Sequence, residues 1–263
     1  TKGLVQTNAS ASATINNIVV GEGSVLNLQT NEAGGTKDDY GTFTLSNVYV
    51  KKDGNFRISV YNEVPDAHVS ADNLSITLES GAIADFGGWK NEGDTTWRPE
   101  GISLTADTLT VNVLDTTDLP TVYLSGVEKM TNIETLSVVA TGDNNTGNAQ
   151  QDLDKLADVV QTNVKDGADG SNVSTPITSN TISDITLTQE ANDIYDGATA
   201  TVDENGTVTG IRSTGNDNID GIVGTASTGF LLWRDEMTSL NRRLDDLRDS
   251  SAHSNGLWAR AYN

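Results

Sequence analysis

The stretch S-A-D-N-L-S-I-T-L, from Ser70 to Leu78, returns in character 35 residues later as T-A-D-T-L-T-V-N-V, from Thr105 to Val113. Apolar and polar side chains alternate within each copy, which places the apolar ones on one face of a strand. These apolar positions are Leu74, Ile76 and Leu78 in the first copy and Leu109, Val111 and Val113 in the second. Stacked copies would share one core, so the repeat predicts a solenoid.

Short alternating runs of this kind, separated by Gly, Asn, Asp and Ser, fill the chain from Ala13 to Val139 and predict β-strands. The clearest runs are Ala13 to Ile15, Ser24 to Leu28, Phe43 to Val50, Phe56 to Val60, Asn73 to Leu78, Thr108 to Val113 and Thr135 to Val139. A meandering antiparallel sandwich would show the same alternation. Equivalent strands that recur in an acidic chain rich in Asn, Ser, Thr and Gly favour the solenoid.

A single coil of such a solenoid, about 20 residues long, is not expected to fold by itself. The aliphatic side chains that it buries do not offset the conformational entropy lost when the coil becomes ordered. Each coil therefore needs the backbone ladder and the apolar face of its neighbour. We expect folding to start at one preformed end, the C-terminal one, and to propagate by addition of coils.

The strand pattern is interrupted between Thr141 and Pro176. Apolar residues recur there with a helical period, which predicts one helix packed against the solenoid. Its apolar stripe consists of Leu153, Leu156, Ala157, Val160 and Val164. Asp152 and Asp154 lie at the amino end and Lys165 at the carboxyl end, as the helix dipole favours.

Strands return after Pro176, from Thr181 to Leu187, from Ala198 to Val202 and from Thr207 to Ile211. The turn residues D-E-N-G, Asp203 to Gly206, predict a hairpin between the last two. Such closing strands would protect the end of the stack from pairing with other chains.

Composition limits the classes of protein that remain. The 263 residues suffice for one elongated domain or two compact ones. A net charge of −21 repels phosphate backbones and anionic lipid headgroups, which argues against nucleic acid as a partner. The chain has no Cys and only two His, so neither disulfides nor thiolate metal sites contribute.

The charge and the apolar content also bear on where the protein works. Residues 234–263 carry five Arg and five acidic residues, so the whole charge deficit lies on residues 1–233. No stretch approaches the roughly 18 apolar residues of a membrane-spanning helix. The amino terminus lacks the apolar core of a signal peptide, and we expect the chain to be a piece of a longer protein. A chain without Cys suits a protein that crosses a membrane unfolded.

The tail of the chain differs from everything before it. The stretch F-L-L-W-R-D-E-M-T-S-L-N-R-R-L-D-D-L-R-D, from Phe230 to Asp249, has the period and propensity of a helix. A break from Ser250 to Gly256 precedes an alternating strand that begins L-W-A-R-A-Y at Leu257. The run L-N-R-R-L-D-D-L-R-D followed by W-A-R at Trp258 closely resembles the linker helix and first barrel strand of monomeric autotransporters of type V secretion.

This resemblance covers about thirty residues and implies a helix that lines the pore of an outer-membrane barrel and leads out to a secreted passenger. The pore helix would carry Leu240, Asn241, Arg242, Arg243, Leu244, Leu247 and Arg248, and the barrel would start with Trp258 and Arg260. In this family the passenger is usually a right-handed parallel β-helix whose C-terminal part templates folding outside the cell. Arginines of a charge-balanced helix fit acidic walls of a polar lumen. A surface-packed or coiled-coil helix is the alternative.

One position departs from the family. In its self-cleaving branch an Asn pair precedes the run and supplies a cyclising nucleophile, whereas Thr238 and Ser239 stand at those positions here. We therefore expect no self-cleavage, and a passenger that stays joined to its barrel unless an external protease cuts it.

The sequence indicates no catalytic residue, no cofactor and no metal site. His68 and His253 have no second His within reach, which favours a solvent-facing role. The stretch D-G-A-D-G-S-N, Asp166 to Asn172, lacks the ligand spacing of an EF-hand and is interpreted as a turn. Trp89 and Trp97 bracket a loop, where they either contact a protein or sugar or cover the side of the solenoid.

The sequence thus predicts an all-β protein in five parts. These are a right-handed parallel β-helix passenger over residues 1–140, a loop-helix insertion over 141–176, a closing β-stack of autochaperone type over 177–229, the linker helix over 230–256 and the start of the first barrel strand over 257–263.

The expected function is that of a surface-exposed passenger fragment, not an enzyme, that mediates adhesion or self-association of cells in aggregates and biofilms. Its partners would be a protein or glycan on a host or bacterial surface, a copy of itself on a neighbouring cell, and its own outer-membrane barrel. One alternative is a non-catalytic stalk and folding template for a protease or esterase domain upstream. Another is a β-helical polysaccharide-degrading enzyme, against which the sparse Lys and Arg argue.

Overall fold

The computed structural model describes residues 1–8, 11–31, 41–60, 67–89, 102–125, 131–141, 146–166, 171–192, 196–215 and 228–241. The chain divides into two compact units, residues 1–216 and residues 217–263. The described elements of the first unit are β1 (Lys2–Asn8), β2 (Ser12–Val20), β3 (Val25–Asn31), β4 (Gly41–Val50), β5 (Asn55–Val60), β6 (Ala67–Leu78), β7 (Ile83–Trp89), β8 (Ile102–Val113), β9 (Thr121–Ser125), β10 (Thr131–Ala140), α1 (Ala149–Ala157), β11 (Val160–Asp166), β12 (Ser171–Pro176), β13 (Asp184–Gln189), β14 (Gly197–Val202) and β15 (Val208–Gly215). The second unit contributes a helix over residues 228–241.

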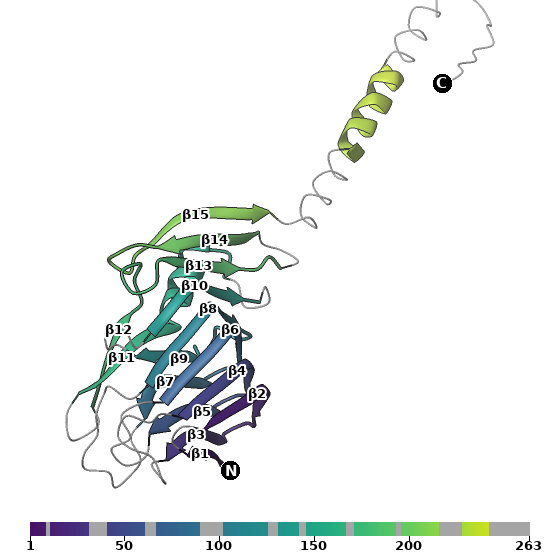
Figure 1. Ribbon diagram of the computed structural model, residues 1–263. Coiled ribbons are helices and arrows are strands. Elements are labelled where there is room, and N and C mark those ends of the chain that lie inside the picture. The colour runs from purple at the N-terminus through teal and green to yellow at the C-terminus, as the bar shows by residue number, and fades with distance from the viewer. Residues whose placement is uncertain are drawn as a thin grey trace, which may run out of the picture. The chain divides into compact units, whose positions relative to one another are not determined.

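Two sheets build the first unit (Figure 1). One joins seven strands in the order β1-β3-β5-β7-β9-β11-β12, and the other joins eight in the order β15-β14-β13-β10-β8-β6-β4-β2. From β1 to β10 the chain alternates between the sheets. Each strand from β1 to β9 pairs in parallel with the strand two places further along, and β10 pairs in parallel with β13. The last strands pair antiparallel, so both sheets are mixed. The described strands close no barrel.

The repeat found in the sequence stacks in register. Strand β6 pairs with β8 so that Leu74 lies beside Leu109 and Ile76 beside Val111. All four side chains are buried, which confirms the prediction of a shared core. The strand predictions between Ala13 and Val139 are also confirmed, because each of the seven runs falls on a strand.

The circuits of the chain are longer than expected from the sequence. Val20 pairs with Val50, Val50 with Leu78, Leu78 with Val113 and Val113 with Ala140, so one circuit takes 27 to 35 residues. Each circuit holds a strand of the seven-stranded sheet, a longer strand of the eight-stranded sheet and the segment that joins them. The estimate of about 20 residues for one coil was therefore too short.

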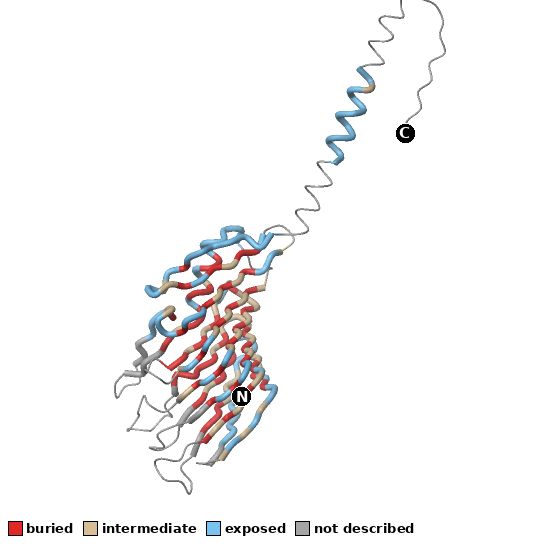
Figure 2. The backbone as a smooth tube through the Cα atoms, turned by 45° about the horizontal axis from the view of Figure 1, so that its top comes forward, coloured by how far each residue is buried: buried red, intermediate tan, exposed pale blue. Residues whose placement is uncertain are grey.

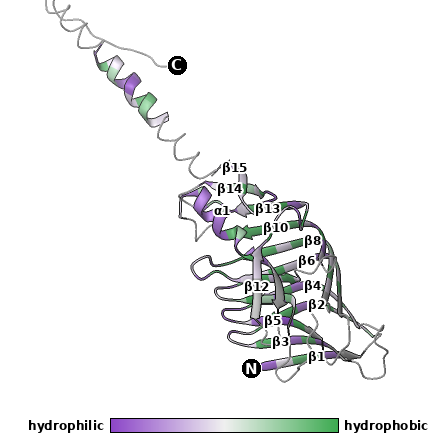
Figure 3. Ribbon diagram, turned by 90° about the vertical axis from the view of Figure 1, so that its left-hand side faces the viewer, coloured by the Kyte–Doolittle hydropathy of each residue, from purple (hydrophilic) through white to green (hydrophobic). Residues whose placement is uncertain are grey.

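Apolar ladders fill the space between the two sheets. One of them consists of Ile18, Val48, Ile76, Val111, Val138 and Leu187, none of which is more than 5% exposed. From the other sheet, Phe56 and Phe86 pack with their ring centroids 5.6 Å apart. Figure 2 shows how buried and exposed residues alternate along the strands, and Figure 3 shows the strands of the eight-stranded sheet one above another. Burial of each such side chain contributes about 1.5–3 kcal/mol to folding.

Tight turns at residues 21–24, 51–54 and 79–82 carry the chain from the eight-stranded to the seven-stranded sheet. Backbone hydrogen bonds join successive turns, from Gly23 N to Lys52 O (2.9 Å) and from Asp53 N to Ser80 O (3.0 Å). Gly23, Asp53 and Gly81 take the same place in the three turns, with φ of 56°, 53° and 64°. Gly adopts this left-handed conformation without steric cost, and Asp tolerates it. The hydrogen-bonded ladder therefore continues through the turns.

Each long strand of the eight-stranded sheet bends where two consecutive residues are both left unburied. These pairs are Asn16-Asn17, Ser46-Asn47, Asp72-Asn73, Asp107-Thr108 and Glu134-Thr135. Alternation between buried and outward side chains resumes after each pair with the opposite phase. The bend therefore divides the outer face of this sheet into two halves.

The helix predicted between Thr141 and Pro176 is shorter than expected. Helix α1 ends at Ala157, and Val160 begins β11, so the prediction that Val160 and Val164 continue the helix is wrong. Strand β11 pairs in parallel with β9. β-Branched residues gain more from this ladder and from the core than from a helical turn. The predicted packing of the helix against the strands is confirmed, since α1 contacts β10, β13, β14 and β15.

The amino end of α1 also differs from the prediction. Asp152 is only 3% exposed, and its carboxylate accepts hydrogen bonds from Thr146, 3.0 Å from the backbone nitrogen and 2.7 Å from the hydroxyl. Asn148 caps the helix, because its side chain accepts from the backbone nitrogen of Gln151 at 3.2 Å. Lys165 lies in β11 and not at a helix end. Asp152 thus fixes the loop before α1 in addition to facing the helix dipole.

Antiparallel strands complete this end of the stack. Strand β13 pairs with β10 on one side and β14 on the other, and β14 pairs with β15. The predicted hairpin is confirmed, with Asp203 Oδ1 accepting from the backbone nitrogen of Thr207 at 2.8 Å and φ of 79° at Gly206. A second hairpin joins β11 to β12 with Asp166 paired to Ser171. This connection is the segment interpreted as a turn, and its residues 167–170 lie outside the described part of the chain.

Candidate interaction surface

Outward residues of the eight-stranded sheet form a surface without a charge, between the bend and the tight turns. We call this surface the uncharged strip. Its first column consists of Asn17, Asn47, Ser75, Thr110, Ser137 and Thr186, and its second column of Val19, Tyr49, Thr77, Asn112, Val139 and Thr188. The chain has a net charge of −21, and this surface crosses six strands without a charged side chain in either column.

Side chains of the strip hydrogen-bond one another, both along a column and between the two columns. Asn47 Nδ2 donates to Asn17 Oδ1 at 3.2 Å, and Asn112 Nδ2 lies 3.2 Å from Ser75 Oγ. Amides and hydroxyls both donate and accept, so hydrogen-bonding capacity remains for a partner. Val19, 63% exposed, adds apolar surface at the end of the second column. Side chains that are held in place before binding lose less entropy when a partner arrives.

The bend beside the strip carries a column of like charges, Asp72, Asp107 and Glu134, which we call the acidic corner. All three residues are exposed. They lie on adjacent strands at the same level, because Ala71, Ala106 and Ile133 just before them are paired in register. Like charges on neighbouring strands repel one another, so the acidic corner destabilises the fold.

We expect Asp107→Asn to stabilise the protein by about 0.2–1 kcal/mol, because it removes the middle charge of the acidic corner with little change of shape. Urea unfolding at low ionic strength, followed by circular dichroism, measures this gain. Glu204→Gln is the matched control, because it removes one negative charge from an exposed turn residue outside the column. An equal gain in the control would show that net charge alone matters.

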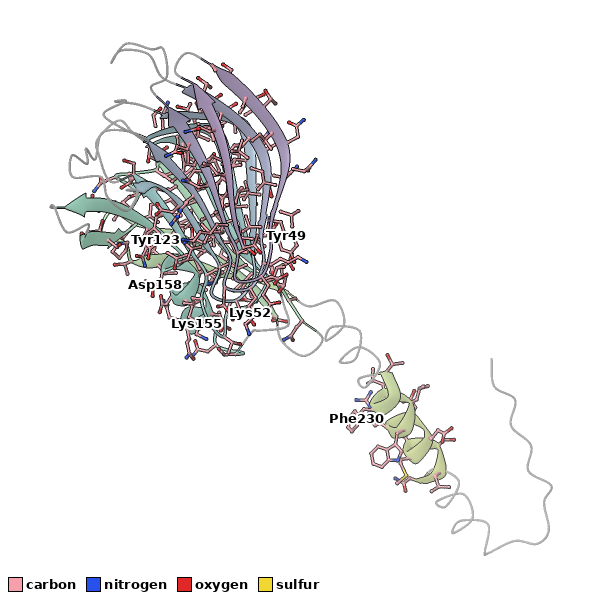
Figure 4. The ribbon with its side chains drawn as sticks, turned by 90° about the horizontal axis from the view of Figure 1, so that it is seen from below. Tyr49, Lys52, Tyr123, Lys155, Asp158 and Phe230 are labelled. Atoms are coloured by element: carbon pink, nitrogen blue, oxygen red, sulfur yellow. The ribbon has the colours of Figure 1, made fainter. Side chains whose placement is uncertain are left out.

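Tyr49, in the second column of the strip, contacts Glu79 in the turn of the next circuit. Figure 4 labels Tyr49 and Lys52 among the side chains of this region. The Tyr49 hydroxyl donates to the Glu79 carboxylate, and the backbone nitrogen of Lys52 donates to the same carboxylate at 2.8 Å. The hydrogen bond from Tyr49, followed by that from Lys52, lowers the pKa of Glu79 below its ordinary value. The same bond to Glu79 raises the pKa of Tyr49. This contact fixes one rim of the strip.

We expect Tyr49→Phe to raise the pKa of Glu79 toward its ordinary value, because the largest cause of the lowering is removed. Carboxyl NMR titration measures this change. The stability linked to Glu79 is fully present above its unfolded-state pKa and is lost as the pH falls through the lower folded-state pKa. It is small, because the pair is near the surface. Tyr123→Phe, on β9, is the control, and a Glu79 titration that Tyr49→Phe leaves unchanged would contradict the assignment.

The outer face of the seven-stranded sheet is polar but covered. Asn27, Arg57 and Asp85 follow one another in register across β3, β5 and β7. Asn27 is 7% exposed and Asp85 is 6% exposed. Asp85 Oδ1 accepts from the backbone nitrogen of Gly87 at 2.9 Å. Buried polar groups with such partners stabilise the fold and do not face a ligand.

The helix over residues 228–241 presents an apolar surface of a different kind. Its large apolar side chains are 40% to 64% exposed, and they are Phe230, Leu231, Leu232, Trp233, Met237 and Leu240. The rings of Phe230 and Trp233 lie with centroids 6.0 Å apart. Apolar residues on several sides are typical of a helix that is enclosed by a partner. The sequence interpretation noted only the face through Leu240 and missed the residues before it.

Of the pore-helix residues predicted from the sequence, the structure describes two, at the end of this helix. Leu240 is 48% exposed, and Asn241 is exposed beside it. The other predicted residues of the linker, barrel and loops lie outside the described part of the chain, namely Arg242, Arg243, Leu244, Leu247, Arg248, Trp258, Arg260, Trp97 and His253. Trp89 ends β7, where it pairs with Ser59, and His68 lies in β6.

Within the described residues, no group of three or more His, Asp or Glu is placed to hold a metal ion. None of the helices described is both long and apolar enough to cross a membrane. Comparisons of the chain with protein-family models, curated proteins and solved structures find no match.

Proposed function

We propose that the chain is the C-terminal part of the passenger of a monomeric autotransporter. The passenger is a right-handed parallel β-helix at the bacterial cell surface, and the helix after it leads into an outer-membrane barrel. Its function is adhesion or self-association of cells, without catalysis. The family assignment is supported by the run from Leu240 to Asp249 and by W-A-R at Trp258.

The topology of the first unit supports a β-helix. Parallel pairing between strands of successive circuits, with the chain alternating between two sheets, is typical of solenoids in which each coil contacts only its neighbours. The in-register columns of Leu, Ile and Val between the sheets supply the shared core that such coils require. The antiparallel meander considered from the sequence would instead pair consecutive strands.

The uncharged strip carries the adhesive function. Adhesion requires a long accessible surface that binds by area, and the strip crosses six strands with amide and hydroxyl groups directed outward. The helix over residues 228–241 supports the second half of the proposal, because it leads into the run from Leu240 to Asp249 that resembles the pore helix.

Display of the full-length protein on a non-aggregating bacterium tests the proposed function. We expect faster settling of the culture, more biofilm or binding to host cells, relative to cells that display the barrel alone. Antibody labelling of the surface confirms equal export. Cells that display the protein and gain none of the three properties would refute adhesion.

A second candidate function is a stalk and folding template for an enzymatic domain upstream. It is favoured by the way α1, β13, β14 and β15 complete one end of the stack, since a preformed end could start the addition of coils. Esterase or protease activity of the full-length protein that disappears when the segment upstream of Thr1 is removed would support this candidate.

A further inference from the structure

We propose that the uncharged strip binds a second copy of this chain, face to face. This inference rests on the proposed adhesive function and names the partner of its surface. The charge of the chain is the first argument. Two chains of net charge −21 repel each other wherever acidic residues meet, and the strip has no charged side chain in either column.

The chemistry of the strip is the second argument. Amides and hydroxyls such as those of Asn17, Ser75 and Thr110 can each act as donor and acceptor. A surface built from them is complementary to itself, as an interface between two identical copies requires. Tyr49 and Val139 lie among them and supply the apolar contact that an uncharged interface also needs.

The spacing of the strands is the third argument. Residues of one column repeat at the distance between neighbouring strands, about 4.8 Å. A second copy repeats its own columns at the same distance, so each contact made on one strand recurs on the next. The regular spacing therefore fits a second copy, whose columns carry the same repeat.

The strip is small for a stable complex. Six strands and two columns cover only a few hundred Å² by the ordinary strand dimensions, on the order of half of the ~800 Å² per partner in standard interfaces. A single contact is therefore weak. Many copies on two cell surfaces would bind together with much greater avidity, which suits association between cells.

Sedimentation velocity of the purified chain over a range of concentrations tests the proposal. Asn17→Asp keeps the oxygen that accepts from Asn47 and adds one charge to the strip. Ser137→Asp adds one near the other end of the first column, on the fifth of its six strands. Asn205→Asp is the matched control, because it makes the same change at an exposed turn residue outside the strip.

We expect the wild-type chain to associate weakly, and more strongly as salt screens the net charge. Both strip variants should weaken association at least about tenfold, whereas Asn205→Asp changes it less than about twofold. Equal association of all variants, association that salt weakens, or a monomer at every concentration would overturn the proposal. The proposal would also be overturned if the chain bound a neutral polysaccharide, such as dextran, more tightly than a second copy, and if the strip variants abolished that binding. If self-association failed in one of these ways but bacteria that display the full-length protein still adhered to host cells, the proposed adhesive function would stand without the proposed partner.

Discussion

Leu109→Ala should destabilise the first unit by about 2–5 kcal/mol. Leu109 is fully buried and lies in an apolar ladder between Leu74 and Leu136, so truncation leaves a cavity that strands on both sides must share. In the proposed β-helix each circuit depends on its neighbours for stability, so a weak circuit in the middle would separate the stack into two parts. Urea unfolding followed by far-ultraviolet circular dichroism should therefore show a lower midpoint and a broader transition than the wild type.

Thr110→Ala is the matched control for this prediction. Thr110 is the next residue of β8, but it points outward in the uncharged strip. Its truncation should change the free energy of unfolding by less than about 1 kcal/mol, since surface substitutions rarely do more. Equal losses for the two variants would show that the stack does not depend on its apolar ladders.

The stacking of the strands could be predicted from the sequence because each copy of the repeat contains the whole pattern of one strand. Ser70 to Leu78 and Thr105 to Val113 each carry the alternation of a strand, and their equal length fixes the register in which Leu74 meets Leu109. A shift by one residue would turn the apolar side chains outward. Register is therefore a property that the pattern itself determines.

The end of α1 could not be predicted in the same way. Leu153 and Leu156 continue to Val160 with a helical period, and nothing local stops the helix at Ala157. What ends it is the edge of β9, which pairs with Val160 and its neighbours from a segment some forty residues earlier in the chain. A pairing partner so distant in the sequence does not change the local helical period. The tertiary contacts with β9 therefore override the helix that this period predicts.

The sequence predicted which residue types the candidate surface would contain, but not where the surface lies on the fold. Polar Asn, Ser, Thr and Asp residues are frequent along the chain, and the sequence interpretation assigned binding to the long faces that carry all four, whereas the strip holds no Asp. Where the uncharged strip runs depends on the bend in each strand, which changes the phase of alternation between Asn16 and Asn17 and at the equivalent pairs. Each residue of a column comes from a different circuit, so the columns appear only when the circuits are stacked in register.

Asp152→Ala is expected to have the second largest effect on stability, about 1.5–3 kcal/mol. The Asp152 carboxylate is buried and accepts from both the backbone nitrogen and the hydroxyl of Thr146. Its removal leaves these donors without their charged acceptor and loosens the loop that leads into α1. Because α1 packs on β13, β14 and β15, the loss should extend to the closing strands and appear as faster amide exchange there.

Asp154→Ala separates this role from the effect of a negative charge near the amino end of a helix. Asp154 lies on the same helix, two residues further on, but it is exposed, and among the described residues it accepts from Gln150 alone, at 2.7 Å. Its loss should cost less than about 0.5 kcal/mol, as expected for an exposed pair on a helix surface. If the two variants lost equal stability, the helix dipole would explain both, and the hydrogen bonds to Thr146 would contribute nothing of their own. A larger loss for Asp152→Ala means that this side chain joins the loop, the helix and the closing strands into one cooperative end of the stack.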